Sequence, residues 1–136
     1  GRSNRELIEA LEDLGATVTP FAIYRWEFPE DLEPLREAVR RIASHDCDVV
    51  LFTSSIQLEH LLVVAREMEL EEKVREALKS VLAVASVGPI MTAALEEESL
   101  PADIVPAHPK MGALVKAAAE ESAQVLARKH ARVNML

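Results

Sequence analysis

The sequence contains only one cysteine, Cys47, which excludes a disulfide framework and a metal cluster with cysteine ligands. We interpret this cysteine as a small apolar residue placed before a strand. The four histidines, His45, His60, His108 and His130, show no ligand spacing either. We therefore interpret all four as structural or exposed residues, and we predict no metal site.

Basic residues are also few, because 15 lysines and arginines stand against 23 acidic residues and give a formal net charge of −8. Nonspecific binding to nucleic acid or to an anionic membrane needs a basic surface, so we expect neither partner. The charge does not exclude a small anionic ligand, since backbone N–H groups and a few arginines can form a local binding site. The chain shows no signal-peptide pattern and no long apolar run, so we expect a cytoplasmic protein.

Segments with helical spacing of apolar residues alternate along the 136 residues with short apolar or β-branched runs. This alternation predicts an α/β fold with a parallel sheet and helices on both faces. The runs at 48–54 and 81–87 are apolar on both faces, so we place them in the centre of the sheet. We expect further strands at 17–26 and 102–106, and helices between the caps Ser3 and Gly15, at 31–44, after a capping box at Ser54 and Gln57, at 71–78, from Pro89 onward, and at 110–129.

Polar residues follow both central strands. Thr53, Ser54 and Ser55 come after the first strand, and Ser86 and Gly88 end the second. In an open parallel sheet the ligand crevice lies outside the carboxyl ends of the strands, where helix N-termini present free N–H groups. We therefore expect these five residues to share one rim, and we expect a ligand to bind there.

Four segments of the chain together resemble the uroporphyrinogen-III synthase family. Ile23-Tyr24-Arg25 is similar to a segment that ends a strand in that family, and residues 48–54 are similar to its Asp-x-Val-x-Phe-Thr-Ser strand. Val87-Gly88-Pro89 resembles its Gly-Pro turn, and residues 99–103, Ser-Leu-Pro-Ala-Asp, resemble its Gly-Leu-Pro-x-Asp loop. The order and spacing of these segments extend over most of residues 1–120.

The resemblance implies a particular domain organisation. Enzymes of this family have two similar α/β domains joined by two crossing strands, with the active site in the cleft between them. Here the resemblance implies a three-layer α/β/α, flavodoxin-like half of that fold. Residues 1–29 would be a helix and a crossover strand of the neighbouring domain, residues 30–128 the C-terminal portion of an α/β domain, and residues 129–136 a frayed tail. We expect the missing N-terminal half, or a second copy of the chain, as a partner.

The resemblance also implies an enzyme, a cyclising hydro-lyase. The family converts hydroxymethylbilane into uroporphyrinogen III and water, with inversion of ring D, in the biosynthesis of haem, sirohaem and cobalamin. No cofactor is required. The protein must hold a flexible polycarboxylate tetrapyrrole so that the unfavoured cyclisation occurs, which is mainly a matter of positioning. Hydroxyl groups and helix N-termini suit the binding of such carboxylates.

Candidate site residues follow from the same resemblance. Tyr24 matches a tyrosine in the crossover strand and would assist loss of the substrate hydroxyl. The hydroxyls of residues 53–55 would bind acetate or propionate groups, with further contacts from Gly88, Thr92 and Lys110. Structural alternatives stay open: packing of an aromatic ring at a strand end for Tyr24, helix capping for the hydroxyls, a helix start for Gly88 and a solvated side chain for Lys110.

One departure from the family pattern favours a different function. After the Gly-Pro turn the family usually carries threonines, whereas Ile90 and Met91 stand here and Thr92 follows. Two hydroxyls that would face the cleft are thereby replaced by apolar groups, unless a shifted turn lets Thr92 replace one of them. The alternative is a noncatalytic α/β module that keeps the fold for binding, regulation or assembly.

Overall fold

The computed structural model describes residues 9, 11–13, 15 and 31–134. Its elements are, in order, α2 (Glu33–Ala43), β1 (Val49–Phe52), α3 (Ser55–Glu67), α4 (Glu71–Ser80), β2 (Ala83–Ser86), α5 (Pro89–Glu97) and α6 (Met111–Asn134). β1 and β2 pair in parallel, so the predicted α/β fold with a parallel sheet is confirmed. Of the predicted N-terminal helix, the described Gly15 has a φ of 89°, the left-handed conformation that suits a helix stop. The predicted strand at 17–26 lies outside the described residues.

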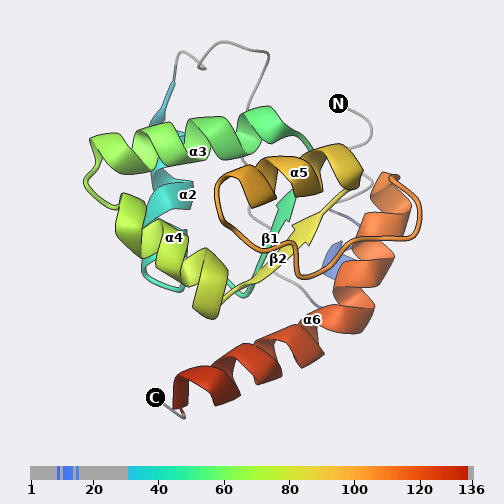
Figure 1. Cartoon of the computed structure of the whole chain (residues 1–136). Coiled ribbons are helices and arrows are strands. Elements are labelled where there is room, and N and C mark those ends of the chain that lie inside the picture. The colour runs from blue at the N-terminus through green and yellow to red at the C-terminus, as the bar shows by residue number, and fades with distance from the viewer. Residues whose placement is uncertain (1–8, 10, 14, 16–30, 135–136) are drawn as a thin grey trace.

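Helices cover both faces of the sheet, as Figure 1 shows. Alternate residues of a strand point to opposite faces, and here they enter two different cores. Val50, Phe52 and Val84 pack with buried side chains of α2, α3, α4 and α5. Ala83 and Ala85 pack on the other face against side chains of α6. The sheet is thus the middle layer of three, and β2 is buried along its whole length.

The strand predicted at 102–106 is reduced to a single bridge. Ile104 pairs in parallel with Ala85. The N–H of Ile104 donates to the carbonyl of Val84 over 3.1 Å, and the N–H of Ser86 donates to the carbonyl of Ile104 over 2.9 Å. β2 therefore has hydrogen-bonded neighbours on both sides, which agrees with its predicted central place.

Two features of the local sequence explain why this third segment is so short. Pro101 and Pro106 lie on either side of the bridge, and neither has an N–H to donate to a neighbouring strand. In addition, the N–H of Val84 donates to a side-chain oxygen of Asp103 over 2.9 Å. A carboxylate thus takes the place that a backbone carbonyl of a longer strand would occupy.

α6 is longer than the sequence predicts. We expected this helix to end near Lys129 and a frayed tail to follow over residues 129–136, but α6 continues to Asn134. Figure 1 shows that the C-terminal half of α6 bends and passes beneath the amino ends of the strands toward α4. Lys129 lies in this half and is only 5% exposed. The segment therefore stays helical because its side chains pack against the rest of the fold.

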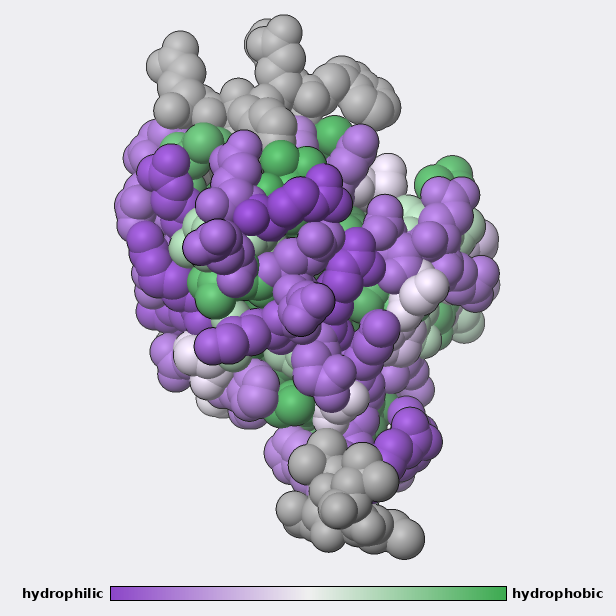
Figure 2. Space-filling view, turned by 60° about the vertical axis from the view of Figure 1, so that its left-hand side comes forward, coloured by the Kyte–Doolittle hydropathy of each residue, from purple (hydrophilic) through white to green (hydrophobic). Residues whose placement is uncertain are grey.

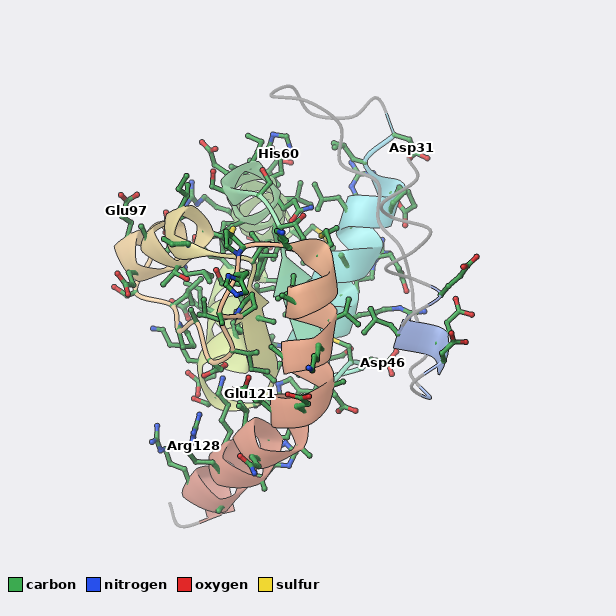
Figure 3. The ribbon with its side chains drawn as sticks, turned by 90° about the vertical axis from the view of Figure 1, so that its right-hand side faces the viewer. Asp31, Asp46, His60, Glu97, Glu121 and Arg128 are labelled. Carbon is green, nitrogen blue, oxygen red and sulfur yellow. The ribbon has the colours of Figure 1, made fainter. Side chains whose placement is uncertain are left out.

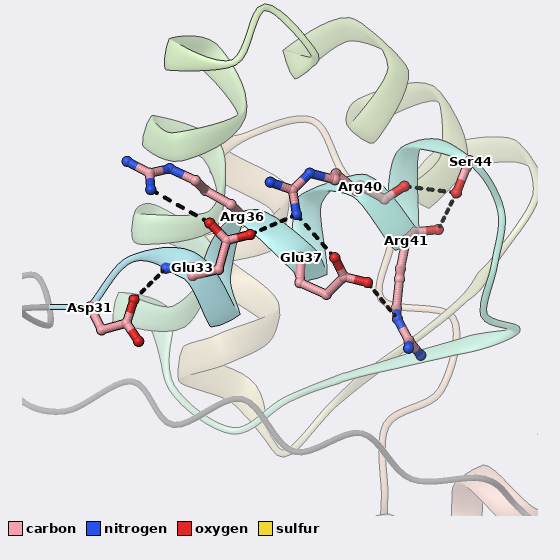
Figure 4. A network of polar contacts seen from close by, with 7 residues as sticks. All are labelled: Asp31, Glu33, Arg36, Glu37, Arg40, Arg41 and Ser44. Atoms are coloured by element: carbon pink, nitrogen blue, oxygen red, sulfur yellow. Dashed lines mark hydrogen bonds and ion pairs between the residues drawn. The ribbon is translucent and has the colours of Figure 1, made fainter.

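α2 is an amphipathic surface helix. One face buries Leu35, Val39 and Ile42. On the other face Arg40 donates to Glu33 over 2.9 Å and to Glu37 over 3.0 Å, within the network drawn in Figure 4. Hydrogen bonds from Arg41 and Arg40 hold the pKa of Glu37 below its ordinary value.

Hydrophilic residues cover most of the molecular face in Figure 2, which brings forward the left-hand side of Figure 1.

Two expectations about single residues can be checked. Cys47 precedes β1 as predicted and is half-buried, and burial raises the pKa of its thiol, with Asp48 and Asp46 adding to the effect. His60 is buried within α3, on which Figure 3 labels it, while His45, His108 and His130 are exposed. In the described part of the chain, no helix has both the length and the apolar character needed to cross a membrane.

Candidate anion-binding rim

The carboxyl ends of the two strands lie side by side, because Phe52 pairs with Ser86. The chain runs from Phe52 through residues 53–54 into α3, and from Ser86 through residues 87–88 into α5. The N-termini of α3 and α5 therefore meet at one edge of the sheet. The sequence predicted this arrangement from the polar residues that follow each strand.

The start of α3 is held by the predicted capping box. The hydroxyl of Ser54 accepts the N–H of Ile56 over 3.4 Å, and the side-chain oxygen of Gln57 accepts the N–H groups of Thr53 and Ser54 over 2.9 and 3.3 Å. The amide nitrogen of Gln57 also donates to the hydroxyl of Thr53 over 3.1 Å. Ser54 and Ser55 nevertheless remain exposed. A hydroxyl that accepts one hydrogen bond can still donate its own proton to a carboxylate, so Ser54 can cap and bind at once.

The start of α5 is held by the buried hydroxyl of Ser86. This hydroxyl donates to the carbonyl of Gly88 over 3.0 Å and lies 2.9 Å from the hydroxyl of Thr92. Since the single proton of Ser86 is directed to Gly88, Thr92 is the donor in the second contact. The N–H of Thr92 also donates to the carbonyl of Gly88 over 2.9 Å. Thr92, which we expected as a ligand contact, therefore has a structural role within this turn.

Gly88 allows the start of a third helix, α6, to lie at the same edge of the sheet. Its backbone is extended, with a φ of −179°, so the turn does not itself require glycine. A Cβ at this position would lie only 2.8 Å from the Cβ of Pro109, so the missing side chain lets the loop before α6 pack on the start of α5. Lys110 follows Pro109 and is exposed. We define the rim as residues 53–55, 87–90 and 108–110.

The two residues after the Gly-Pro turn face in opposite directions. The side chain of Ile90 is 83% exposed, whereas that of Met91 is 2% exposed and packs in the larger core. We expected both positions to face the cleft, and for Met91 this expectation is wrong, because its long apolar side chain is accommodated among core residues. Ile90 therefore places an exposed aliphatic side chain beside the exposed hydroxyls of Ser54 and Ser55 and the lysine of the rim.

The charges at the helix starts form a pattern that we had not drawn from the sequence. The first turns of α3, α5 and α6 contain no acidic residue, whereas α2 and α4 begin with Glu33 and with Glu71 and Glu72. Acidic residues favour the positive end of a helix dipole, and their absence leaves that end available to an external anion. Among the helices that the structure describes, the three that start at the rim are the ones without acidic residues in the first turn, in a chain with a net charge of −8. The signal is present in the sequence, but it is recognised only when the helix bounds are known.

One expected site residue is not placed by the structure. Tyr24, the candidate for assisting hydroxyl loss, lies outside the described residues. Within the described part of the chain, no group of three or more histidine, cysteine, aspartate or glutamate side chains could hold a metal ion.

Comparison with known proteins agrees with the resemblance seen in the motifs. A protein of Bacillus subtilis named "Uncharacterized protein YjjA" is 29% identical over 115 residues, which are 85% of this chain and 42% of that protein. A protein of Methanothermobacter thermautotrophicus named "Putative uroporphyrinogen-III synthase" is 35% identical over 100 residues, which are 74% of this chain and 38% of that protein. The chain thus spans about two fifths of the length of these curated relatives. No solved structure matches it significantly.

A family match extends through all the strands and most of the helices described above. The model of the family described as uroporphyrinogen-III synthase HemD matches residues 1–116 of the 136 residues. This match includes the capping box at the start of α3, the Gly-Pro turn and the loop that carries Asp103. The chain therefore belongs to the uroporphyrinogen-III synthase family.

Proposed function

We propose that this chain takes part in the formation of uroporphyrinogen III from hydroxymethylbilane. The observation that carries the proposal is the rim, where three helix starts without acidic residues meet exposed hydroxyls of Ser54 and Ser55 and the ammonium group of Lys110. Such groups suit the acetate and propionate side chains of a linear tetrapyrrole. Membership of the family supports a role in tetrapyrrole synthesis.

In the proposed reaction, the C–O bond of the terminal hydroxymethyl group breaks and the oxygen leaves as water after it has accepted a proton. The resulting cation is attacked at a substituted carbon of ring D, and a spiro intermediate forms. Fragmentation and a second closure give the macrocycle with ring D inverted, so that hydroxymethylbilane yields uroporphyrinogen III and one water. We assign the donation of the proton, or of a hydrogen bond to the departing oxygen, to Tyr24.

Positioning is the main task of the rim in this reaction. Without restraint the chain ends of the substrate close directly, so the enzyme must hold the carboxylates in a geometry that favours attack at the substituted carbon. The hydroxyls of residues 53–55 and the helix starts of α3 and α5 would bind these carboxylates. Ile90 would contact an apolar part of the substrate beside them, since it is the exposed aliphatic side chain of the rim.

The domain organisation is part of the proposal. We propose that residues 30–128 form one wall of a cleft and that residues 1–29 belong to the neighbouring domain. The other wall would come from an N-terminal half or from a second copy of the chain. On this view the isolated chain binds the substrate more weakly than an assembly that contains both walls.

The isomer ratio of the product tests the proposed activity. Hydroxymethylbilane is supplied to this chain, and uroporphyrinogen I and III are separated, with a sample without protein giving the spontaneous type I background. We expect type III above that background, either from this chain alone or after addition of an N-terminal half of a family member. Type I alone in both samples would contradict the proposal.

Variants of the rim connect this activity to the described residues. Ser55→Ala and Lys110→Ala should lower the yield of type III, because each removes a polar contact to a carboxylate. Ser44→Ala is the matched control, since Ser44 is exposed at the end of α2 and its hydroxyl donates to the carbonyl of Arg40. Equal loss of type III in the control and in the rim variants would contradict the assignment of the rim.

A noncatalytic binding module remains the second candidate function. The observation that favours it is the Gly-Pro turn, where an exposed Ile90 and a buried Met91 replace the hydroxyls usual in the family. Titration calorimetry with uroporphyrin III, a stable octacarboxylate, separates the two candidates. Binding that Lys110→Ala weakens, with no type III formed in any assembly, would favour the module over the enzyme.

A further inference from the structure

Lys129 makes a buried set of polar contacts far from the rim. Its ammonium group donates to the carbonyl of Leu78 over 3.0 Å, to the carbonyl of Leu82 over 2.6 Å and to a carboxylate oxygen of Asp103 over 2.7 Å. The side chains of Lys129 and Asp103 are 6% and 7% exposed. A lysine ammonium has three protons, so the three acceptors satisfy it completely.

The three acceptors belong to three different parts of the fold. Leu78 lies in the last turn of α4, where carbonyls have no partner within the helix. Leu82 immediately precedes β2, and Asp103 precedes the bridge at Ile104. One side chain of α6 therefore makes hydrogen bonds to the end of α4, to the residue before the central strand and to the third segment of the sheet.

This contact arises from a part of the chain that the family model does not match. The match ends at residue 116, near the start of α6, and Lys129 lies in the half of α6 that follows. Glu121 and Arg128, which Figure 3 labels on α6 before and after its bend, are exposed, while Val125 and Lys129 are buried against the fold. The half-helix thus has an inward face that combines an apolar contact with a charged one.

We propose that residues 121–134 form a strap that Lys129 fastens across the amino end of the sheet, and that release of the strap also releases residues 103–104 from β2. The inference does not depend on the proposed function. If Lys129 leaves, the carboxylate of Asp103 remains buried without its cation, which is strongly unfavourable. The carboxylate must then move toward water, and the N–H of Val84 loses the acceptor that Asp103 supplies.

Native-state hydrogen exchange on the full chain tests whether these parts open together. We expect the backbone amides of Val84 and Ile104 and those of residues 125–130 to exchange through one opening event, with similar protection. Exchange of the 125–130 amides about 100-fold faster than that of Ile104 would show that the strap frays independently. Such a result would overturn the proposal.

Substitutions test the role of the ion pair itself. Lys129→Met should raise the exchange rates of the Val84 and Ile104 amides by about 100-fold or more, because it leaves the carboxylate buried alone. Lys116→Met is the matched control, since Lys116 is an exposed lysine of the same helix, and it should leave both rates unchanged. An equal effect of the two substitutions would contradict the proposal.

A double variant distinguishes loss of the ion pair from a general failure of the chain to fold. In Lys129→Met/Asp103→Asn the buried charge is absent, while the amide oxygen of asparagine can still accept the N–H of Val84. We expect this chain to protect Val84 and Ile104 better than Lys129→Met alone does. Lower or equal protection in the double variant would mean that the pair does not fasten the strap.

Discussion

The two ends of the sheet are held by different kinds of polar contact. At the carboxyl end the hydrogen bonds join residues close in sequence, as between Ser86 and Gly88, two positions apart, and between Gln57 and Thr53, four positions apart. At the amino end Lys129 reaches acceptors 26, 47 and 51 positions away. At the rim, the neighbouring hydroxyls of Ser54 and Ser55 are exposed, whereas the ion pair of Lys129 with Asp103 is buried.

Because of this difference, we expect the amino end of the sheet to contribute mainly to stability and the carboxyl end mainly to binding. Contacts within one turn fix the start of a helix without joining it to the rest of the fold, so the rim can present its side chains to a ligand. Contacts between distant segments contribute to the stability of the whole fold, because they are lost only when those segments separate. We therefore expect substitutions at the amino end to lower stability and most substitutions at the rim to affect binding.

The largest effect is expected for Asp103→Ala. This substitution leaves the ammonium of Lys129 buried without its carboxylate and removes the acceptor of the Val84 N–H. The free energy of unfolding should fall by about 3–5 kcal/mol, measured by urea denaturation. Asp46→Ala is the control, because Asp46 is exposed and should change stability by less than about 0.5 kcal/mol. Similar losses in both variants would remove the contrast between the two ends.

A smaller effect is expected where the rim itself is tightly packed. Gly88→Ala places a Cβ 2.8 Å from the Cβ of Pro109, so the loop before α6 must shift. The cost should be about 1–3 kcal/mol in the free energy of unfolding. Gly112→Ala is the matched control, because nothing lies within 4 Å of its added Cβ and alanine favours the helix. If Gly88→Ala proves as stable as Gly112→Ala, the three helix starts are not held together as described.

The capping box should give a still smaller effect on stability. Ser54→Ala removes the acceptor of the Ile56 N–H, and we expect a loss of about 0.5–2 kcal/mol in thermal denaturation. Ser54→Asp keeps the cap but places a negative charge at the rim. This second variant should remain stable and bind uroporphyrin III more weakly than the unaltered chain. Unchanged binding would argue that the start of α3 does not contact the carboxylates.

The smallest effect concerns the ion pairs on the surface of α2 and at the start of α4. Hydrogen bonds from Arg41 and Arg40 lower the pKa of Glu37, and a hydrogen bond from Arg66, followed by one from Arg75, lowers that of Glu71, relative to an ordinary value of 4.5. Because the folded pKa lies below the unfolded one, the stabilisation is present above the ordinary value and is lost as the pH falls through the lowered pKa.

Carboxyl titrations followed by NMR should locate both glutamates below their ordinary pKa. Added salt should move the values back, since screening weakens exposed ion pairs. Urea midpoints measured across the same acid range should depend less on pH in Glu37→Gln than in the unaltered chain. Identical pH dependence in the two proteins would show that this network contributes nothing measurable.

Local patterns allowed much of the fold and the rim to be predicted from the sequence. The capping box, the Gly-Pro turn and the apolar runs each depend on residues only a few positions apart, so they can be recognised without knowing the fold. The edge that Ser54 and Gly88 share then follows from the geometry of a parallel sheet. Tyr24 stays a prediction, because it lies outside the described residues.

Contacts between distant segments could not be predicted in the same way. A lysine in a helix gives no indication that its acceptors are Leu78, Leu82 and Asp103, so residue 129 was assigned to a tail. The third segment was predicted at 102–106, where Ile104 forms its bridge, but its extent was overestimated, because the sequence does not show that the Asp103 carboxylate will replace a backbone carbonyl. The inward orientation of the Met91 side chain could not be predicted either, because the space that it fills in the core forms only when the helices pack together.

The single bridge at Ile104 has a consequence for the behaviour of the chain at high concentration. Sheets associate edge to edge when a row of N–H and C=O groups is open to another molecule. On this side of the described sheet Pro101 and Pro106 interrupt the row within a few residues of the bridge. Such an edge is a poor template for further strands, so this flank should resist aggregation although Val105 beside it is 42% exposed.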